Sequence, residues 1–183
     1  MTDHNEIKDN IQPEAVAVDR KSSSSFYVKA AILSLVIVVL NLWFTSNFRI
    51  GIDGQEIRCL PDHKYFLVDM RKTQPELDSI MAYSASGLEP WFIDGTMMAK
   101  IVSGMPGDRV VVNEQGVFVN GEIKASGFLL ANTLEMDIEQ FFTSYTIPED
   151  HLLMLAPAPE SYDGRYWGLI HKDQLVGKVR PLL

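Results

Sequence analysis

Residues 97–112, MMAKIVSGMPGDRVVV, contain the pattern on which the fold of this sequence depends. Two short runs, Ala99–Val102 and Arg109–Val112, are dominated by apolar and β-branched side chains, and glycine, proline and aspartate separate them. Such runs are typical of strands, and the Gly107-Asp108 dipeptide is typical of a turn. This stretch therefore predicts two strands joined by a tight connection.

The same pattern recurs on both sides of this stretch. Further predicted strands are Tyr65–Val68, Val117–Val119, Leu152–Leu155 and Leu175–Val179, and Asn120-Gly121 is a hairpin turn signal. Two segments, Thr73–Gly95 and Ser126–Tyr145, lack this pattern. In the second, apolar side chains are spaced by four and three residues, as on one helical face, at Leu134, Ile138, Phe141 and Tyr145. We expect a mostly β domain.

An uncharged apolar run, Ala30–Phe48, precedes this domain. As a helix its 19 residues span about 28 Å, close to the hydrocarbon thickness of a bilayer. A cleaved signal peptide would start near residue 1, and a buried core helix is the other alternative. We therefore predict a disordered tail over residues 1–29, a retained transmembrane helix over 30–48 and a folded domain over 49–183.

The orientation of this helix does not follow from its flanking charges. The basic residues nearby are Arg20, Lys21 and Lys29 on one side and Arg49, Arg58 and Lys64 on the other. Because these counts tie, the positive-inside rule does not decide. We expect the commoner arrangement, with the short tail in the cytoplasm and the large domain translocated.

Composition excludes several classes of function. Sixteen Lys+Arg against 24 Asp+Glu give a net charge of −8, which argues against a nucleic-acid partner. A single cysteine excludes an intramolecular disulfide and a cysteine-rich zinc site. Because His4, His63, His151 and His171 are scattered, with no two at metal-ligand spacing, we expect no zinc or iron site. We also expect no cofactor.

Two residues could carry chemistry. Cys59 is the lone cysteine, and it is open to three interpretations: a small buried hydrophobe, a nucleophile, or a lipidated cysteine, although its eleven-residue distance from Phe48 disfavours lipidation. Lys100 shares a predicted strand face with Met98 and Val102. A desolvated lysine loses its proton more readily and can act as a general base, whereas an edge lysine would extend to water.

A third segment, Glu160–Gly168, combines polar and aromatic residues. Asp163 and Arg165 could pair and brace a turn, and Tyr166 and Trp167 supply an apolar anchor. Alone, this segment predicts an ordered loop and no reaction.

Three short boxes of the sequence resemble, in the same chain order, the motifs of the type I signal peptidase family. They are Lys100–Val110 (KIVSGMPGDRV), Val117–Gly121 (VFVNG) and Ser161–Gly168 (SYDGRYWG). The resemblance is greatest to the TraF-type pilin-processing peptidases of plasmid conjugation. It implies a signal-peptidase-like β domain behind one N-terminal transmembrane helix. It also implies a bacterial inner-membrane protein with a periplasmic catalytic domain.

The resemblance also implies roles for individual residues. Cys59 falls where the family has the nucleophilic serine of a Ser-Met-Pro box, and Lys100 falls at the general base. A thiol is deprotonated far more easily than a hydroxyl, so that a Cys–Lys dyad is chemically reasonable. Ser161 would orient the lysine amine, and an Asp163–Arg165 pair would hold that loop.

Substrate would bind as an added strand along the edges near residues 57–60 and 97–100. The expected groove residues are Ile57, Leu60, Pro61 and Met98.

Three departures from the family pattern accompany these matches. Ile57 replaces a second serine that helps to bind the oxyanion in many Gram-negative members, Leu155-Ala-Pro157 replaces Gly-Asp-Asn, and Gly164 replaces a serine. Losing one oxyanion donor costs about 10²–10³ in rate. These changes fit a specialised peptidase and also a decayed one.

The expected function is therefore removal of the signal or leader peptide from a conjugative pilin precursor, with release by hydrolysis or by cyclisation of the pilin. The alternative is a catalytically inactive assembly factor of a conjugative type IV secretion system that keeps the fold and the groove. A lipoprotein or plain membrane anchor is a third interpretation.

Overall fold

The computed structural model describes residues 24–54, 58–60 and 63–182, and the chain divides into two compact units, Met1–Leu42 and Trp43–Leu183. The first long element is helix α1, Ser24–Asn47, which begins earlier than its predicted start at Ala30. Residues 24–29, predicted as tail, thus belong to the helix; residues 1–23 lie outside the described part. The 24-residue helix is long and apolar enough to cross a membrane.

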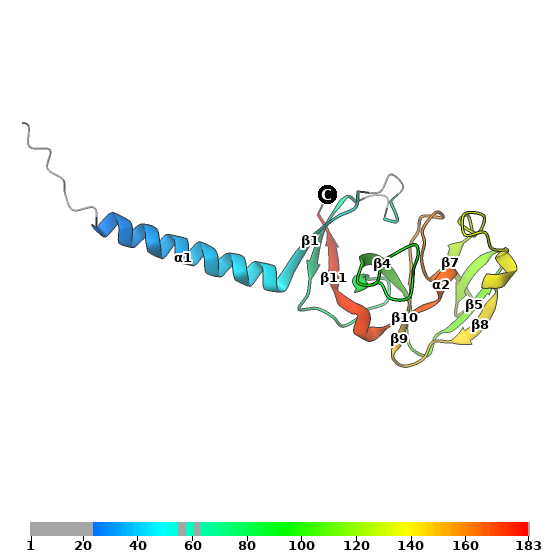
Figure 1. Ribbon diagram of the computed structural model, residues 1–183. Coiled ribbons are helices and arrows are strands. Elements are labelled where there is room, and N and C mark those ends of the chain that lie inside the picture. The colour runs from blue at the N-terminus through cyan, green and yellow to red at the C-terminus, as the bar shows by residue number, and fades with distance from the viewer. Residues whose placement is uncertain (1–23, 55–57, 61–62, 183) are drawn as a thin grey trace, which may run out of the picture. The chain divides into compact units, whose positions relative to one another are not determined.

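A seven-stranded antiparallel sheet begins directly after the helix. Its strands are β1 (Phe48–Ile52), β2 (Tyr65–Asp69), β3 (Ile80–Ser84), β4 (Met97–Gly104), β9 (His151–Leu155), β10 (Leu169–His171) and β11 (Leu175–Pro181). The order is β1-β2-β11-β3-β4-β9-β10, so that the C-terminal strand lies between β2 and β3 (Figure 1). Phe48, predicted as the last membrane residue, is the first residue of β1.

A second, four-stranded sheet lies beside the first (Figure 1). Its strands are β5 (Arg109–Asn113), β6 (Gly116–Val119), β7 (Glu122–Ser126) and β8 (Thr143–Thr146), in the order β7-β6-β5-β8. At the β6–β7 turn, Asn120 and Gly121 have φ of 51° and 86°, which these residue types tolerate best. The Asn120 Oδ1 accepts a 2.9 Å hydrogen bond from the Arg109 N–H, which ties this hairpin to β5.

All six predicted strands are present, and the mostly β class is confirmed. The prediction missed five strands: β1, β3, β7, β8 and β10.

The helical face expected over 126–145 is wrong as secondary structure. The segment contains a 3₁₀ turn, Ile138–Phe141, followed by β8, and positive φ at Gly127 and Glu135 interrupts any helix. Its four spaced apolar residues nevertheless all pack on the core of the four-stranded sheet. The pattern correctly indicates one buried face because irregular chain can bury the same residues.

Strands β3 and β4 separate two hydrophobic clusters, and these position the site. The cluster on one face contains Met81, Tyr83, Val102, Leu152, Met154 and Ile170. The cluster on the other contains Leu60, Phe66, Val68, Ala82 and Val179. Successive residues of β4 point alternately into the two clusters, as strand geometry requires.

Candidate active site

Lys100 lies in the middle of β4 and is almost fully buried, with 2 % of its surface exposed. It is paired with Met81 of β3 and lies between Met98 and Val102 on the same face. Its Nζ donates a 2.6 Å hydrogen bond to the Ser161 Oγ, and Ser161 is completely buried. The lysine therefore does not extend to water, and its amine is held by a hydroxyl.

The loop that carries Ser161 is fixed by a buried ion pair. The Arg165 Nε lies 2.8 Å from the Asp163 Oδ1, and neither side chain is more than 1 % exposed. The guanidinium also donates to the Ala156 carbonyl at 2.9 Å and to the Ser126 carbonyl at 3.2 Å. The pair thus holds the chain on both sides of Ser161.

Asp163 also caps the short helix α2, Gly164–Trp167, by accepting a hydrogen bond from the Arg165 N–H. A Cβ at Gly164 would lie 2.9 Å from the Met154 carbonyl oxygen. Backbone cannot yield cheaply there, so glycine rather than serine fits this turn. The departure at position 164 thus has a local steric cause.

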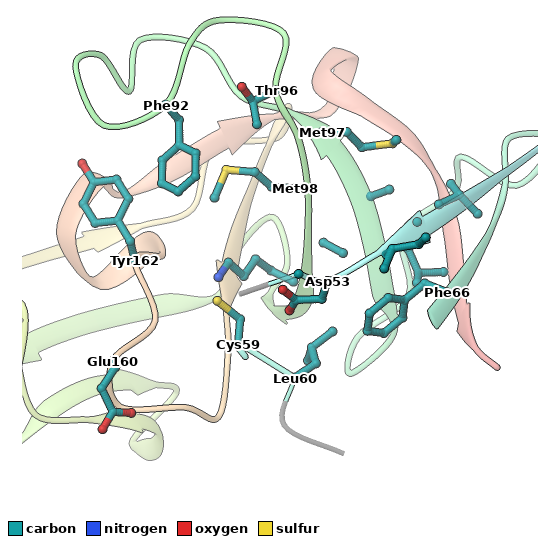
Figure 2. Close-up of a pocket in the computed structure, with 18 residues that line it drawn as sticks. Asp53, Cys59, Leu60, Phe66, Phe92, Thr96, Met97, Met98, Glu160 and Tyr162 are labelled. Atoms are coloured by element: carbon teal, nitrogen blue, oxygen red, sulfur yellow. The ribbon is translucent and has the colours of Figure 1, made fainter. Parts of the chain in front are cut away.

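A pocket of about 650 Å³ joins Lys100 to Cys59. Both residues line it, and Cys59 is half-buried. Figure 2 shows the Cys59 side chain directed into the pocket, between Met98, Phe92 and Tyr162 on one side and Leu60 and Phe66 on the other. The single cysteine and the single buried lysine of the described chain therefore share one cavity.

Aromatic rings form one end of this pocket. Phe92, from the loop between β3 and β4, stacks on Tyr162 with ring centroids 5.8 Å apart and planes 16° apart. Burial raises the pKa of Tyr162 above its ordinary value. Asp53 and Glu160 add carboxylates to the lining (Figure 2).

One edge of β4 is only partly occupied. Strand β9 pairs with Ile101, Val102 and Gly104, while β3 pairs along Met97–Ile101 on the other edge. Within the described ranges, no strand pairs with Met97–Lys100 on the β9 side. An unpaired edge that borders a pocket can accept an extended peptide as an additional strand.

The predicted site residues are partly brought together. Cys59, Leu60, Met98 and Lys100 line the pocket, and Ser161 contacts Lys100. Ile57 and Pro61 lie outside the described residues. In the part of the chain that the structure describes, no three His, Cys, Asp or Glu side chains gather as a metal ligand set.

The sequence prediction missed several aromatic residues near the site, among them Tyr162, Phe92 and Tyr83. Phe92 lies in the 73–95 segment, where no periodic signal exists, and Tyr83 lies on the unpredicted strand β3. Only knowledge of the β3–β4 pairing places Tyr83 on the strand next to Lys100, on the same face of the sheet.

Comparison with known proteins then assigns the family. The family model "Signal peptidase, peptidase S26" matches residues 24–183, which is most of the chain. The chain belongs to the signal peptidase S26 family. This membership and the apolar helix α1 together indicate a membrane-anchored protein of a peptidase family.

Relatives within this family include proteins of plasmid transfer. The chain is 31 % identical over 104 residues to "Plasmid transfer protein TraF" of Escherichia coli, covering 55 % of this chain and 58 % of that protein. It is 27 % identical to "Conjugal transfer protein TraF" of Agrobacterium fabrum, covering 78 % of this chain and 76 % of that protein. The chain therefore spans little more than half of the E. coli protein.

Two signal peptidases are also similar. "Probable signal peptidase I-2" of Synechocystis is 26 % identical, with 61 % of this chain and 50 % of that protein covered. A solved signal peptidase I from Enterococcus faecalis V583 is 23 % identical with a TM-score of 0.36, covering 57 % of this chain and 96 % of that one.

Proposed function

We propose that this protein is a membrane-anchored endopeptidase that removes the signal or leader peptide of a conjugative pilin precursor through a Cys59–Lys100 dyad. The observation that carries the proposal is the pocket whose lining includes both Cys59 and a buried lysine held by Ser161. Family membership supports peptidase chemistry, and the TraF relatives support a substrate from plasmid transfer.

Lys100 acts in this proposal as the general base in its neutral form. Among the described residues, the ion pairs do not include Lys100. Burying an ammonium without a counter-ion costs several kcal/mol of free energy. A cost of this size favours the uncharged amine, which can accept a proton. The hydrogen bond to Ser161 leaves the amine lone pair available for the thiol proton.

The chemistry then follows in two stages. Cys59 transfers its proton to the Lys100 Nζ, and the sulfur attacks the scissile carbonyl carbon to give a tetrahedral oxyanion. Collapse of this intermediate breaks the C–N bond, the leaving amine takes the proton from Lys100, and a thioester remains. Water then passes a proton to Lys100 as its oxygen attacks the thioester carbonyl; the C–S bond breaks, and the sulfur takes that proton back from Lys100. A cyclic pilin forms only where the thioester holds the pilin body, after a cut near its C-terminus: the pilin amino terminus then attacks, its proton passes through Lys100 to the leaving sulfur, and the new amide closes the ring.

Substrate binding uses the partly open β4 edge. The precursor pairs with Met97–Lys100 as an added strand, which brings its backbone past both Cys59 and Lys100. Leu60 and Met98 contact its side chains in the apolar part of the pocket. Helix α1 holds the enzyme in the inner membrane, with the tail in the cytoplasm and the catalytic domain in the periplasm near membrane-inserted precursors.

The test is replacement of the nucleophile. Cys59→Ala cells should accumulate uncleaved pilin precursor, and Cys59→Ser should retain a small fraction of the wild-type activity because serine is the ordinary nucleophile of the family. A Cys59→Ala strain that still processes the precursor would show that the dyad is wrong and would favour an inactive assembly factor. Mass measurement of the product separates linear from cyclic pilin.

A further inference from the structure

The hydroxyl of Tyr83 is a buried polar group without a hydrogen-bond partner in the described part of the chain. Tyr83 lies on β3 and is completely buried. An unsatisfied buried hydroxyl destabilises the folded state, and phenylalanine would fill the same space without that cost. The hydroxyl would therefore be stabilised by a hydrogen-bond acceptor that forms only in another state of the site.

Tyr83 lies directly behind the pocket wall. The β3–β4 register pairs Tyr83 with Met98 and Met81 with Lys100, so that Tyr83 and Lys100 occupy the same face of the sheet. Met98 lines the pocket and also packs on the cluster that contains Tyr83. The Trp167 ring lies 6.1 Å from the Tyr83 ring and covers it on another side.

The electrostatic surroundings of Tyr83 keep its proton in place. Burial raises the pKa of Tyr83 far above its ordinary value, and negative charge on Asp163 and Cys59 raises that pKa further. The phenol therefore remains a donor across the pH range of a working enzyme. Met98, which packs on the cluster that contains Tyr83, lines the pocket together with Cys59.

Of these two anions, Asp163 already has its hydrogen bonds. Its carboxylate accepts from the Ala156 N–H and from three N–H groups of Arg165. A thiolate at Cys59, in contrast, forms only after the thiol has lost its proton. The acceptor that appears during the reaction is thus the sulfur.

We propose that Tyr83 is a third catalytic residue, which donates its hydroxyl hydrogen bond to the Cys59 sulfur once that sulfur has passed its proton to Lys100. This inference rests on the proposed function. The thiol proton goes to the Lys100 Nζ, the phenolic proton stays on the tyrosine oxygen, and no other bond changes. Because a thiolate accepts a hydrogen bond much better than a thiol does, the donor favours the nucleophilic form.

The experiment measures the acidity of the thiol directly, without pilin. The rate of Cys59 alkylation by iodoacetamide is followed against pH in the detergent-solubilised full chain, with Cys59→Ala as the blank. Tyr83→Phe should move the midpoint of this profile upward by about one pH unit, which is a tenfold loss of alkylation rate below the midpoint. In pilin cleavage it should lower kcat about tenfold and leave KM unchanged.

Tyr145→Phe is the matched control, because Tyr145 is also partly buried but lies on β8 in the other sheet. It should leave the midpoint where it is. An unshifted midpoint in Tyr83→Phe overturns the inference. If the unfolding temperature of that variant also falls, the hydroxyl has a structural role instead. Failure of the dyad itself looks different: Cys59→Ala would still cleave pilin.

Discussion

Strand β4 and the short helix α2 each contain a buried basic side chain, and the two side chains have opposite kinds of partner. Arg165, 3 % exposed, is matched by the Asp163 carboxylate and by several backbone carbonyls. Lys100, 2 % exposed, donates to the Ser161 hydroxyl and belongs to none of the ion pairs of the described residues. The fully paired guanidinium fits a structural role, whereas an amine held by a neutral hydroxyl fits a residue that exchanges protons.

Replacing the lysine should separate activity from stability. Lys100→Met should lower pilin cleavage at least about 10³-fold, because general-base catalysis contributes about 10²–10⁴. Its urea unfolding midpoint should stay the same or rise, since an apolar side chain of similar length replaces a buried polar one. Cleavage and urea unfolding of the purified chain measure both.

Lys124→Met is the control, because Lys124 lies on β7 and pairs with Glu122 away from the pocket. It should change cleavage less than twofold. A Lys100→Met enzyme with normal turnover would remove the lysine from the mechanism.

Replacing the arginine should have the reverse effect. Arg165→Met leaves the Asp163 carboxylate buried without its partner, which typically costs about 3–5 kcal/mol of unfolding free energy. Equilibrium urea unfolding measures this loss. Arg109→Met, at an exposed position on β5, should stay within about 0.5 kcal/mol of wild type. Equal stability of the two variants would mean that the buried pair contributes no net stability.

Ser161 connects the two regions, and its hydroxyl should matter for turnover more than for folding. Ser161→Ala removes the acceptor that orients the Lys100 amine, and misplacing a catalytic group by about 1 Å costs about 10²-fold in rate. We expect kcat to fall by about 10–10² with little change in KM. Ser103→Ala serves as the control, because Ser103 lies on β4 and, like Ser161, is buried. If both variants turn over alike, the hydroxyl does not position the amine.

A partly exposed ion pair gives the smallest expected effect. Arg71 bonds both oxygens of Asp69, and its hydrogen bonds lower the pKa of Asp69 below the ordinary 3.8. Because the folded-state pKa is depressed, the stabilisation is complete above the unfolded value and disappears as pH falls through the folded value. Asp69→Asn should therefore be less stable than wild type near pH 6, and the difference should shrink toward zero as the pH falls below the ordinary 3.8 and through the lower folded-state pKa.

Unfolding midpoints of both chains across this pH range test the sign. Glu114→Gln, on an exposed turn, should give a difference that does not depend on pH in this way. A difference between wild type and Asp69→Asn that grows on acidification contradicts the assignment.

The strands with strong local signals were predictable, and those defined by partners were not. Arg109–Val112 and Leu152–Leu155 carry runs of β-branched or large apolar residues, whereas the segment at Ser79–Ser84 mixes serine, alanine and tyrosine and becomes a strand because β4 and β11 flank it. Helical spacing at Leu134–Tyr145 reflected burial on one side and not a helix. The order of the sheet, which puts Tyr83 and Lys100 on one face of neighbouring strands, depends on long-range pairing that no local pattern encodes.

The residues of the candidate site also differ in how far the sequence alone could predict them. Lys100, Ser161 and the Asp163–Arg165 pair lie in boxes with a recognisable order, and the structure brings them into contact. Cys59 lies in a segment with little periodicity, so that its neighbours in the pocket, Phe92 and Tyr162, could be identified only from the fold.

The short open edge of β4 also has a thermodynamic consequence. A free strand edge invites pairing with other chains, and proteins limit that hazard by keeping such edges short. Here only Met97–Lys100 is left open on that side in the residues that the structure describes. Under the proposed function, a bound precursor would complete the sheet as an added strand and would raise the melting temperature of the protein. Once the cleaved segment leaves, that added stability is lost, and the enzyme returns to its less stable form with the edge open for the next chain.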